Sequence, residues 1–107
     1  MNKVRRRYLA LEIKAAKMTD SKEFINTVWS AILKLYGEYG ASRTGLTLIN
    51  YDIAKRFAVI RTLHSAVEMI RTALASVTRI GDEPAAVHIV AVSGTLKGLY
   101  EKTKQYC

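Results

Sequence analysis

The stretch from Gly45 to Arg61, GLTLINYDIAKRFAVIR, constrains the fold more than any other part of the chain. Residues 46–51 and 57–61 alternate with the period of a β-strand, and the four residues 52–55 between them suit a hairpin. Strict alternation places Tyr51 on the face opposite Leu48. A strand pattern and a helix pattern come before this hairpin, and a helix pattern and a strand pattern follow it. The order predicts an α+β, ferredoxin-like (split βαβ, RRM-like) sandwich with a four-stranded antiparallel sheet, βαββαβ, plus a C-terminal helix.

The first half of the chain predicts one strand and one helix. Residues 6–14 alternate as a strand, whose aliphatic side chains Leu9, Leu11 and Ile13 are expected to pack against helices. Residues 21–36 form the predicted helix, because Asp20 stands in a capping-box pattern and Gly37 supplies a left-handed stop. The predicted buried stripe of this helix is Phe24, Ile25, Val28, Ile32 and Leu35, bordered by Trp29.

The second half repeats these elements in reverse order. A second helix is predicted over residues 66–77, with a capping box at Ser65. Its expected stripe is Val67, Ile70, Leu74 and Val77. Residues 80–84 form a turn cluster, and residues 86–92 are the predicted last strand. Its expected faces are Val87, Ile89 and Ala91 on one side and His88, Val90 and Val92 on the other. A final helix from Leu96 to about Gln105 is expected to cover the second sheet face through Leu96 and Leu99, beginning after a cap at residues 93–95.

Length and hydropathy limit the classes of protein to which the chain can belong. With 107 residues, of which 50% are hydrophobic, the chain is expected to be one ferredoxin-like, RNA-associated domain over residues 1–107. No apolar run is long enough to span a bilayer, and charged residues interrupt the place where a signal peptide needs its apolar region. We therefore expect a cytoplasmic protein without a membrane partner. The single cysteine, Cys107, is interpreted as a dispensable terminal residue.

Positive charge is the strongest functional signal from composition. Seventeen Lys and Arg residues stand against nine Asp and Glu residues, for a net charge of +8. That excess is typical of a nucleic-acid-binding domain, although general solubility or an acidic protein partner would also fit. First and third strands are central, antiparallel neighbours in this fold, so the start of one lies near the end of the other. The sequence thus predicts a basic stripe for RNA phosphates, made of Arg5, Arg6, Arg7, Lys55, Arg56 and Arg61. The alternative is that Arg61 pairs with Glu12 or another acid within the sheet and that the N-terminal arginines are merely frayed.

No catalytic constellation is apparent. His64 and His88 are not at a metal-ligand spacing, and Ser93 has no evident base. His64 is interpreted as a polar loop residue, with contact to a phosphate or base as the alternative, and His88 as a packed imidazole. We therefore expect no catalytic residue, no metal site and no cofactor bound by this chain.

Several segments, in this order and spacing, resemble a known family. They are residues 5–9 (RRRYL), 35–40 (LYGEYG), 45–46 (GL), 49–52 (INYD), 60–61 (IR), 73–74 (AL) and 92–95 (VSGT). Together they resemble archaeal ribonuclease P protein component 2, a member of the eukaryotic and archaeal RNase P protein family. The resemblance covers the chain from about Arg5 to Lys97.

The resemblance implies a non-catalytic subunit of the ribonucleoprotein endoribonuclease that removes the 5′ leader from precursor tRNA. It implies that the RNase P RNA holds the magnesium ions and cleaves, and that precursor tRNA is met through the holoenzyme. It also implies pairing with a TIM-barrel subunit, RNase P protein component 3, and allows a homodimer within a heterotetramer. Tyr39 and Tyr51 are the side chains expected at a protein interface, since tyrosine suits such surfaces. The alternative is a small ferredoxin-like ligand-binding domain or enzyme whose basic charge is incidental.

Overall fold

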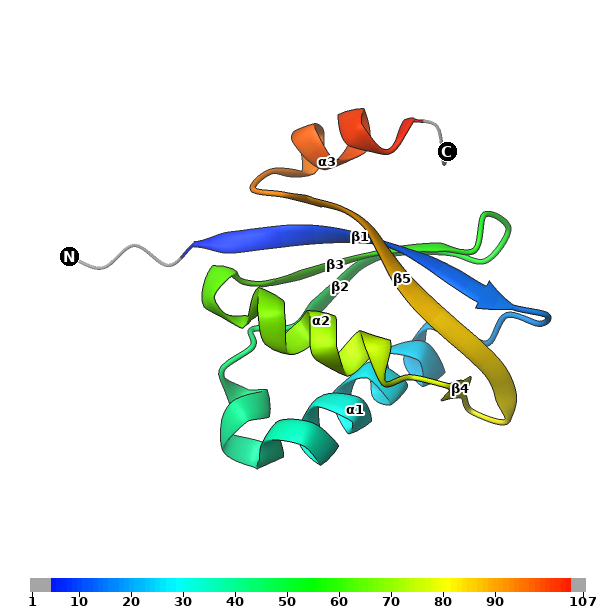
Figure 1. Ribbon diagram of the computed structural model, residues 1–107. Coiled ribbons are helices and arrows are strands. Elements are labelled where there is room, and N and C mark those ends of the chain that lie inside the picture. Colours follow the sequence, from blue (N-terminus) through cyan, green and yellow to red (C-terminus); the bar gives the residue numbers. More distant parts are fainter. Residues whose placement is uncertain (1–4, 105–107) are drawn as a thin grey trace.

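The computed structural model describes residues 5–104, which form a curled antiparallel sheet with helices on both faces (Figure 1). The elements in chain order are β1 (Arg6–Ala15), α1 (Ser21–Ser42), β2 (Thr47–Asp52), β3 (Phe57–Leu63), a 3₁₀ turn η1 (His64–Ala66), α2 (Val67–Ala75), β4 (Arg79–Ile80), β5 (Glu83–Ser93) and α3 (Leu96–Lys102). No helix in this part of the chain is long and apolar enough to cross a membrane. The expectation for Cys107 lies outside the described residues.

The sheet has the strand order β2-β3-β1-β5-β4, so β1 and β3 lie at its centre. The predicted number of four strands was wrong, because β4 adds a short fifth strand. Ile80 pairs with Glu83 across a turn that begins with Gly81, whose φ of 60° favours glycine. This pairing also starts β5 at Glu83, three residues earlier than the sequence predicted. The turn itself was predicted, but the two strand ends beside it were not.

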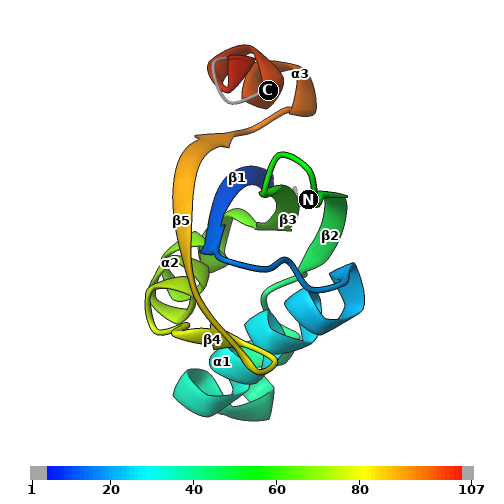
Figure 2. The same ribbon diagram turned by 90° about the vertical axis from the view of Figure 1, so that its right-hand side faces the viewer.

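The two faces of the sheet carry different helices. α1 and α2 cover one face, where Leu9, Leu11 and Ile13 are at most 2% exposed, as predicted. α3 lies over the other face, on the opposite side of the sheet from α1 and α2 (Figure 2). There Leu99 is fully buried and packs, with Leu96, against Ala10, Phe57 and Val59. The predicted cover over the second face is therefore confirmed.

Two β-bulges change which side chains face the helices. The register between β1 and β5 shifts so that Leu11 pairs with Ile89 and Ala10 with Ala91, which leaves Val90 as the extra residue. Val90 and Ala91 consequently both pack on the α3 side, whereas Val92 packs with the main core. The strict alternation predicted for Ala91 and Val92 was wrong for this reason.

The second bulge lies in β2. Leu48 pairs with Ile60 and Asn50 with Val59, so Ile49 is the extra residue and packs on the α3 side. Tyr51 then falls on the same face as Leu48, against the main core, and not on the opposite face as predicted. A sequence pattern with a period of two does not reveal a single extra residue, and each bulge moves every later side chain of its strand to the opposite face of the sheet.

α1 begins as predicted and ends later. The carboxylate of Asp20 accepts a hydrogen bond from the backbone N–H of Glu23 at 2.8 Å, which confirms the cap. Gly37 has φ 73° and ψ −179°, so the helix kinks there, but it resumes and runs to Ser42. Glycine was expected to end the helix; instead it permits a kink between two helical pieces. Leu35, predicted in the buried stripe, is 46% exposed beside this kink.

The start of α2 and the end of α3 also differ from prediction. Residues 64–66 form η1, and the N-cap of α2 is Ala66, without a side-chain hydrogen bond, so the predicted Ser65 cap was wrong. α2 ends at Ala75, and the buried Val77 lies beyond it. Thr95 does cap α3, since its Oγ1 accepts from Gly98 N at 3.0 Å. α3 ends at Lys102; the predicted end near residue 105 lies outside the described residues.

Candidate nucleic-acid interface

The N-terminal end of β1 gathers basic side chains from several parts of the chain. The β1–β3 register pairs Arg6 with Leu63, Arg7 with Thr62 and Tyr8 with Arg61. The backbone carbonyl of Arg5 accepts a hydrogen bond from His64 N at 2.7 Å, so the strand start is fixed to η1. The predicted neighbours Arg6, Arg7 and Arg61 therefore do lie at one end of the sheet.

Arg61 lies on the α3 side of the sheet. It follows Phe57 and Val59 in alternation, and it sits between Tyr8 on β1 and Thr47 on β2. Its Nε is buried and has no hydrogen-bond partner among the described residues, although the side chain as a whole is half-buried. Because Nε is buried, an external phosphate or carboxylate can reach this guanidinium only through its two terminal nitrogens.

The alternative partner of Arg61 is engaged elsewhere. Glu12 Oε1 lies 3.4 Å from Lys14 Nζ, and both side chains are on β1. Among residues 5–104, the described ion pairs are this one and Arg71 with Glu68, at 3.6 Å. The Arg61–Glu12 pair is thus not formed, which leaves Arg61 available to a ligand.

Arg7 lies against the turn between β5 and α3. Its Nη1 donates to the Arg6 carbonyl at 3.1 Å and is 3.4 Å from where a Cβ on Gly94 would stand. Alternation along β1 places Arg7 and Tyr8 on opposite faces. Since Arg61 shares the face of Tyr8, the basic residues wrap around the end of the sheet and do not cover one flat face.

Three further basic side chains belong to this end and were missed or discounted from the sequence. Leu63 N donates to Thr44 O at 2.8 Å, which brings the adjacent Arg43 to the end of β3. Lys97 is exposed in the first turn of α3, next to Gly94, and His64 is exposed in η1. The sequence did contain a signal for these residues, because a loop that follows one strand and a loop that precedes its antiparallel neighbour lie at the same end of the sheet. We call these seven residues the basic end: Arg5, Arg6, Arg7, Arg43, Arg61, His64 and Lys97.

The hairpin tip carries the other predicted basic residues, at the opposite end of the sheet. Glu12 pairs with Phe57, so Lys55 and Arg56 are about 20 Å from Arg7 at roughly 3.4 Å per residue. Lys55 is exposed. The predicted footprint is therefore a stripe that joins two ends of the sheet.

Arg56 makes structural contacts that the sequence did not reveal. Its φ is 53°, and its carbonyl accepts from Ile13 N at 2.9 Å. Its guanidinium donates to the carbonyls of Ala15 and, at 3.3 Å, Ala16. Arg56 thus fastens the hairpin tip to the last residues of β1, and fewer of its donors remain for an external ligand.

The two predicted interface tyrosines lie in different settings. Tyr39 is 76% exposed near the end of α1, where Arg43 Cζ lies 5.4 Å from its ring centre. Tyr51 is half-buried, with its ring 5.2 Å from that of Phe24 and its hydroxyl hydrogen-bonded to Thr19 O at 2.7 Å. Burial raises the pKa of Tyr51, and the nearby carboxylates of Asp20 and Glu23 raise it further. Large exposed apolar side chains accompany Tyr39 on α1, namely Leu33, Leu35 and Tyr36.

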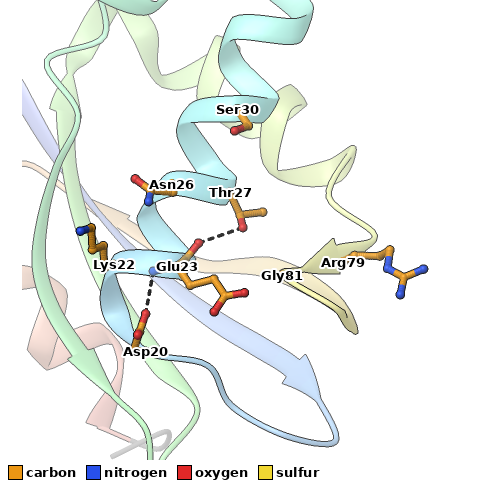
Figure 3. A pocket seen from close by; sticks show the side chains of 8 residues that line it. All are labelled: Asp20, Lys22, Glu23, Asn26, Thr27, Ser30, Arg79 and Gly81. Carbon is orange, nitrogen blue, oxygen red and sulfur yellow. Dashed lines mark hydrogen bonds between the residues drawn. The ribbon is translucent and has the colours of Figure 1, made fainter.

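An open polar groove lies beside the N-terminal half of α1 (Figure 3). Its acidic side chains, Asp20 and Glu23, are exposed, and Asp20 is occupied in capping the helix. Arg79 at its rim donates to Asp82 O at 3.0 Å and points away from both carboxylates. The groove has a volume of about 420 Å³ and is lined by both acidic and basic side chains, so it is suited to polar contacts at the surface.

Within residues 5–104, no three His, Cys, Asp or Glu side chains gather as they would around a metal ion. His88, which was expected to be packed, is exposed.

Comparison with known proteins gives the same family over nearly the whole chain. Residues 7–104 match the model of the Rpp14/Pop5 family. The protein named ribonuclease P protein component 2 from Methanosarcina mazei is 29% identical over 103 residues, which cover 96% of this chain and 87% of that protein. Its namesake from Pyrococcus furiosus is 28% identical over 98 residues, covering 92% and 82%.

A solved structure shares the fold. A chain in the cryo-EM structure of yeast ribonuclease MRP superposes with a TM-score of 0.73, over 100% of this chain and 97% of that one. The two sequences are 17% identical, so this likeness concerns the fold alone.

Proposed function

The chain belongs to the Rpp14/Pop5 family, and on that premise we propose that it is a protein subunit of ribonuclease P. The observation that carries this proposal is the family match over residues 7–104, joined by relatives that are named as ribonuclease P protein component 2. The chain is then part of an RNA-processing ribonucleoprotein. We also propose that its four long strands keep the ferredoxin-like arrangement, to which β4 is an addition, and that it acts in the cytoplasm.

The proposed reaction is removal of the 5′ leader from precursor tRNA by the whole particle. In this proposal the RNA subunit holds magnesium and cleaves the substrate, while the protein binds and supports that RNA. The chain contributes no catalytic residue; it supplies cations at fixed positions. The resemblance supports this division of labour, and the net charge of +8 is in keeping with it.

The basic end is the proposed RNA contact. Phosphate contacts position a protein on folded RNA without reading its sequence, and they come chiefly from Arg and Lys. Arg61 belongs to the proposed contact because its side chain is only half-buried and forms no ion pair among the described residues. Lys55 extends the contact to the hairpin tip, whereas Arg56 mainly holds the tip in place.

The proposed protein partner is a TIM-barrel subunit of the kind named RNase P protein component 3, in an assembly that allows a homodimer within a heterotetramer. The exposed side chains Leu33, Tyr36 and Tyr39 on α1 support a protein contact there, since aromatic residues are enriched in interfaces. Tyr51 contributes less to such a contact, because its ring and hydroxyl are already engaged.

Reconstitution tests the proposed function. RNase P RNA, the partner subunits and precursor tRNA are combined with or without this chain, and cleavage at the 5′ leader is followed at low magnesium and over a range of salt. We expect the chain to raise cleavage at low magnesium and to do nothing to precursor tRNA by itself. Cleavage that is the same with and without the chain would contradict the proposal and favour the alternative of an unrelated ligand-binding domain.

A further inference from the structure

The outer edge of β5 has no strand partner over most of its length. β5 pairs with β1 along residues 85–93, but with β4 only at Glu83 and Pro84. Beyond β4, the outer edge is met at Ala85, whose N–H donates to Thr78 O at 2.9 Å. It is met again at Val92, whose carbonyl accepts from Lys102 Nζ at 2.8 Å. Within the described residues, an edge of about six residues, 86–91, therefore has no strand partner on its outer side.

Backbone groups on this edge have no strand partner among the described residues. Because the N–H and C=O of successive residues point to alternate sides of a strand, and Ala85 points away from β1, Val87 and Ile89 also direct theirs outward. Natural sheets usually protect such an edge with lysine, proline or inward charges. The open residues, AVHIVA, contain no proline and no Lys, Arg, Asp or Glu.

A groove runs beside the open edge, between β5 and α2. It has a volume of about 300 Å³, and its floor includes Leu74, Val77 and Val87, all buried. Among the described residues that line it, Arg71 contributes a polar side chain, whereas alternation along β5 directs the side chain of His88 to the opposite face. Among the described residues, Arg71 forms an ion pair with Glu68 on the same helix, at 3.6 Å between largely exposed side chains, and such pairs are weak. The groove therefore offers an apolar floor with a cationic rim at Arg71, and none of the described residues that line it carries a carboxylate.

We propose that β5 accepts an extended segment of another protein, which adds a strand to the sheet and carries acidic side chains alternating with aliphatic ones. Backbone hydrogen bonds to Val87 and Ile89 would supply affinity, and pockets for alternate side chains would supply specificity. The inward aliphatic side chains would cover the groove floor. An acidic side chain of the bound segment would lie near Arg71 and pair with its guanidinium. This surface lies on other residues than the basic end and the exposed face of α1, so it is separate from the proposed RNase P contacts.

A second copy of the chain fits this edge poorly. Antiparallel pairing of two β5 strands about a twofold axis would place two copies of the same basic chain side by side. The two chains also carry +8 each. Charge complementarity therefore favours an acidic segment over self-association.

Amide hydrogen exchange, measured by NMR, tests the proposal on the full-length chain. The probe is a short blocked peptide of alternating glutamate and valine, and its control is the same peptide with lysine in place of glutamate. In the free protein, the Val87 and Ile89 amides are expected to exchange much faster than those of Leu9 and Leu11. With the glutamate peptide at saturation, their exchange should slow by about tenfold or more, as for amides newly placed in a ladder. The lysine peptide should leave them unchanged.

Variants separate charge recognition from simple loss of folding. Arg71→Glu should weaken binding of the glutamate peptide by about fivefold or more, the scale of an exposed ion pair lost and reversed. Arg71→Gln should have an intermediate effect, and Lys34→Glu, a matched reversal on α1, should have none. The proposal is overturned if both peptides protect the two amides equally or neither does, if Lys34→Glu acts like Arg71→Glu, or if the chain alone dimerises with these amides protected. Protection by a single-stranded RNA and not by the peptide would also overturn it.

Discussion

The hydroxyl of Tyr51 donates a hydrogen bond to the backbone carbonyl of Thr19 across 2.7 Å. Tyr51 is the last residue but one of β2, and Thr19 lies in the loop that leads into α1. The same ring packs 5.2 Å from that of Phe24, centre to centre. One side chain therefore fixes the hairpin to the start of α1 by a polar and an apolar contact, and the bulge at Ile49 is what turns it to this face.

Tyr51→Phe is expected to lower the free energy of unfolding by about 1 kcal/mol, because it removes the hydrogen bond and keeps the ring. Urea denaturation followed by circular dichroism measures the change. Tyr39→Phe is the matched control, since that hydroxyl is exposed, and it should change stability by less than half as much. Equal losses in the two variants would contradict the structural role given to the Tyr51 hydroxyl.

The raised pKa of Tyr51 predicts a stability loss at alkaline pH. Burial keeps this phenol protonated in the folded state at pH values where the unfolded chain, with a pKa near 10.0, has already lost its proton. The stabilising contribution is thus fully present below about pH 10 and decreases as pH rises toward the folded pKa. Denaturation at a series of pH values should show a steeper loss for the parent protein than for Tyr51→Phe. Parallel curves would show that Tyr51 is not the group responsible.

Lys55 and Arg56 are neighbours in one turn and should separate stability from RNA binding. Arg56→Ala is expected to lower the free energy of unfolding by about 1–2 kcal/mol, because charged hydrogen bonds to the end of β1 are lost. Lys55→Ala should leave stability within about 0.5 kcal/mol, as for other exposed sites. Binding to RNase P RNA should show the opposite order: Lys55→Ala should reduce the salt dependence of the affinity more than Arg56→Ala does. The reverse pattern would mean that Arg56 is the RNA contact at the tip.

Arg6→Ala with Arg7→Ala tests the basic end. Each lost phosphate contact should flatten the plot of log affinity against log salt by about one unit, and the loss should be similar for different RNA sequences. Filter binding or fluorescence anisotropy with RNase P RNA at several salt concentrations measures the slope. The control, Lys34→Ala with Arg79→Ala, removes the same charge from α1 and β4. If the slope falls equally in both double variants, net charge and not the basic end governs binding.

Tyr36→Ser with Tyr39→Ser is expected to weaken association with the TIM-barrel subunit, because both side chains lie on the exposed face of α1. Sedimentation of the mixed proteins at micromolar concentration measures it, and the variant should shift the mixture toward two separate species. Tyr100→Ser, an exposed tyrosine on α3, is the control and should sediment as the parent does. An unchanged complex in the first variant would place the protein interface elsewhere.

The elements and their helix-side core were predictable, because Leu9, Leu11 and Ile13 on β1 and Ile70 and Leu74 on α2 follow simple periods. The turn at Gly81 was predictable as well, but β4 was not, since a strand of two residues exists only by pairing with Glu83 and Pro84. The break at Gly37 was placed correctly and interpreted wrongly. A glycine signals that the backbone can leave the helical region; whether the helix resumes depends on packing beyond it, such as the close approach at Gly40, where a Cβ would lie 3.3 Å from Met69 Cε.

The basic residues were easier to find than to assign. Runs of arginine are visible in a sequence, and the strand topology correctly placed Arg6 and Arg7 near Arg61. The structural role of Arg56 depends on carbonyls of Ala15 and Ala16, about forty residues earlier, which no local pattern reports. Arg43 was missed for a related reason, since it reaches the same end through the hydrogen bond between Leu63 and Thr44.

The bulge at Val90 sets where the chain tolerates a change of length. Removing Val90 would restore regular pairing and leave Ala91, Val92 and Ser93 opposite the partners on β1 that they have now. Removing Val87 instead would invert the facing of the residues around it and turn buried side chains outward. The same holds for Ile49 in β2, and both extra residues lie beneath α3. Single-residue gaps in natural variants of this chain should therefore collect at these two positions, one in each strand that flanks the central pair.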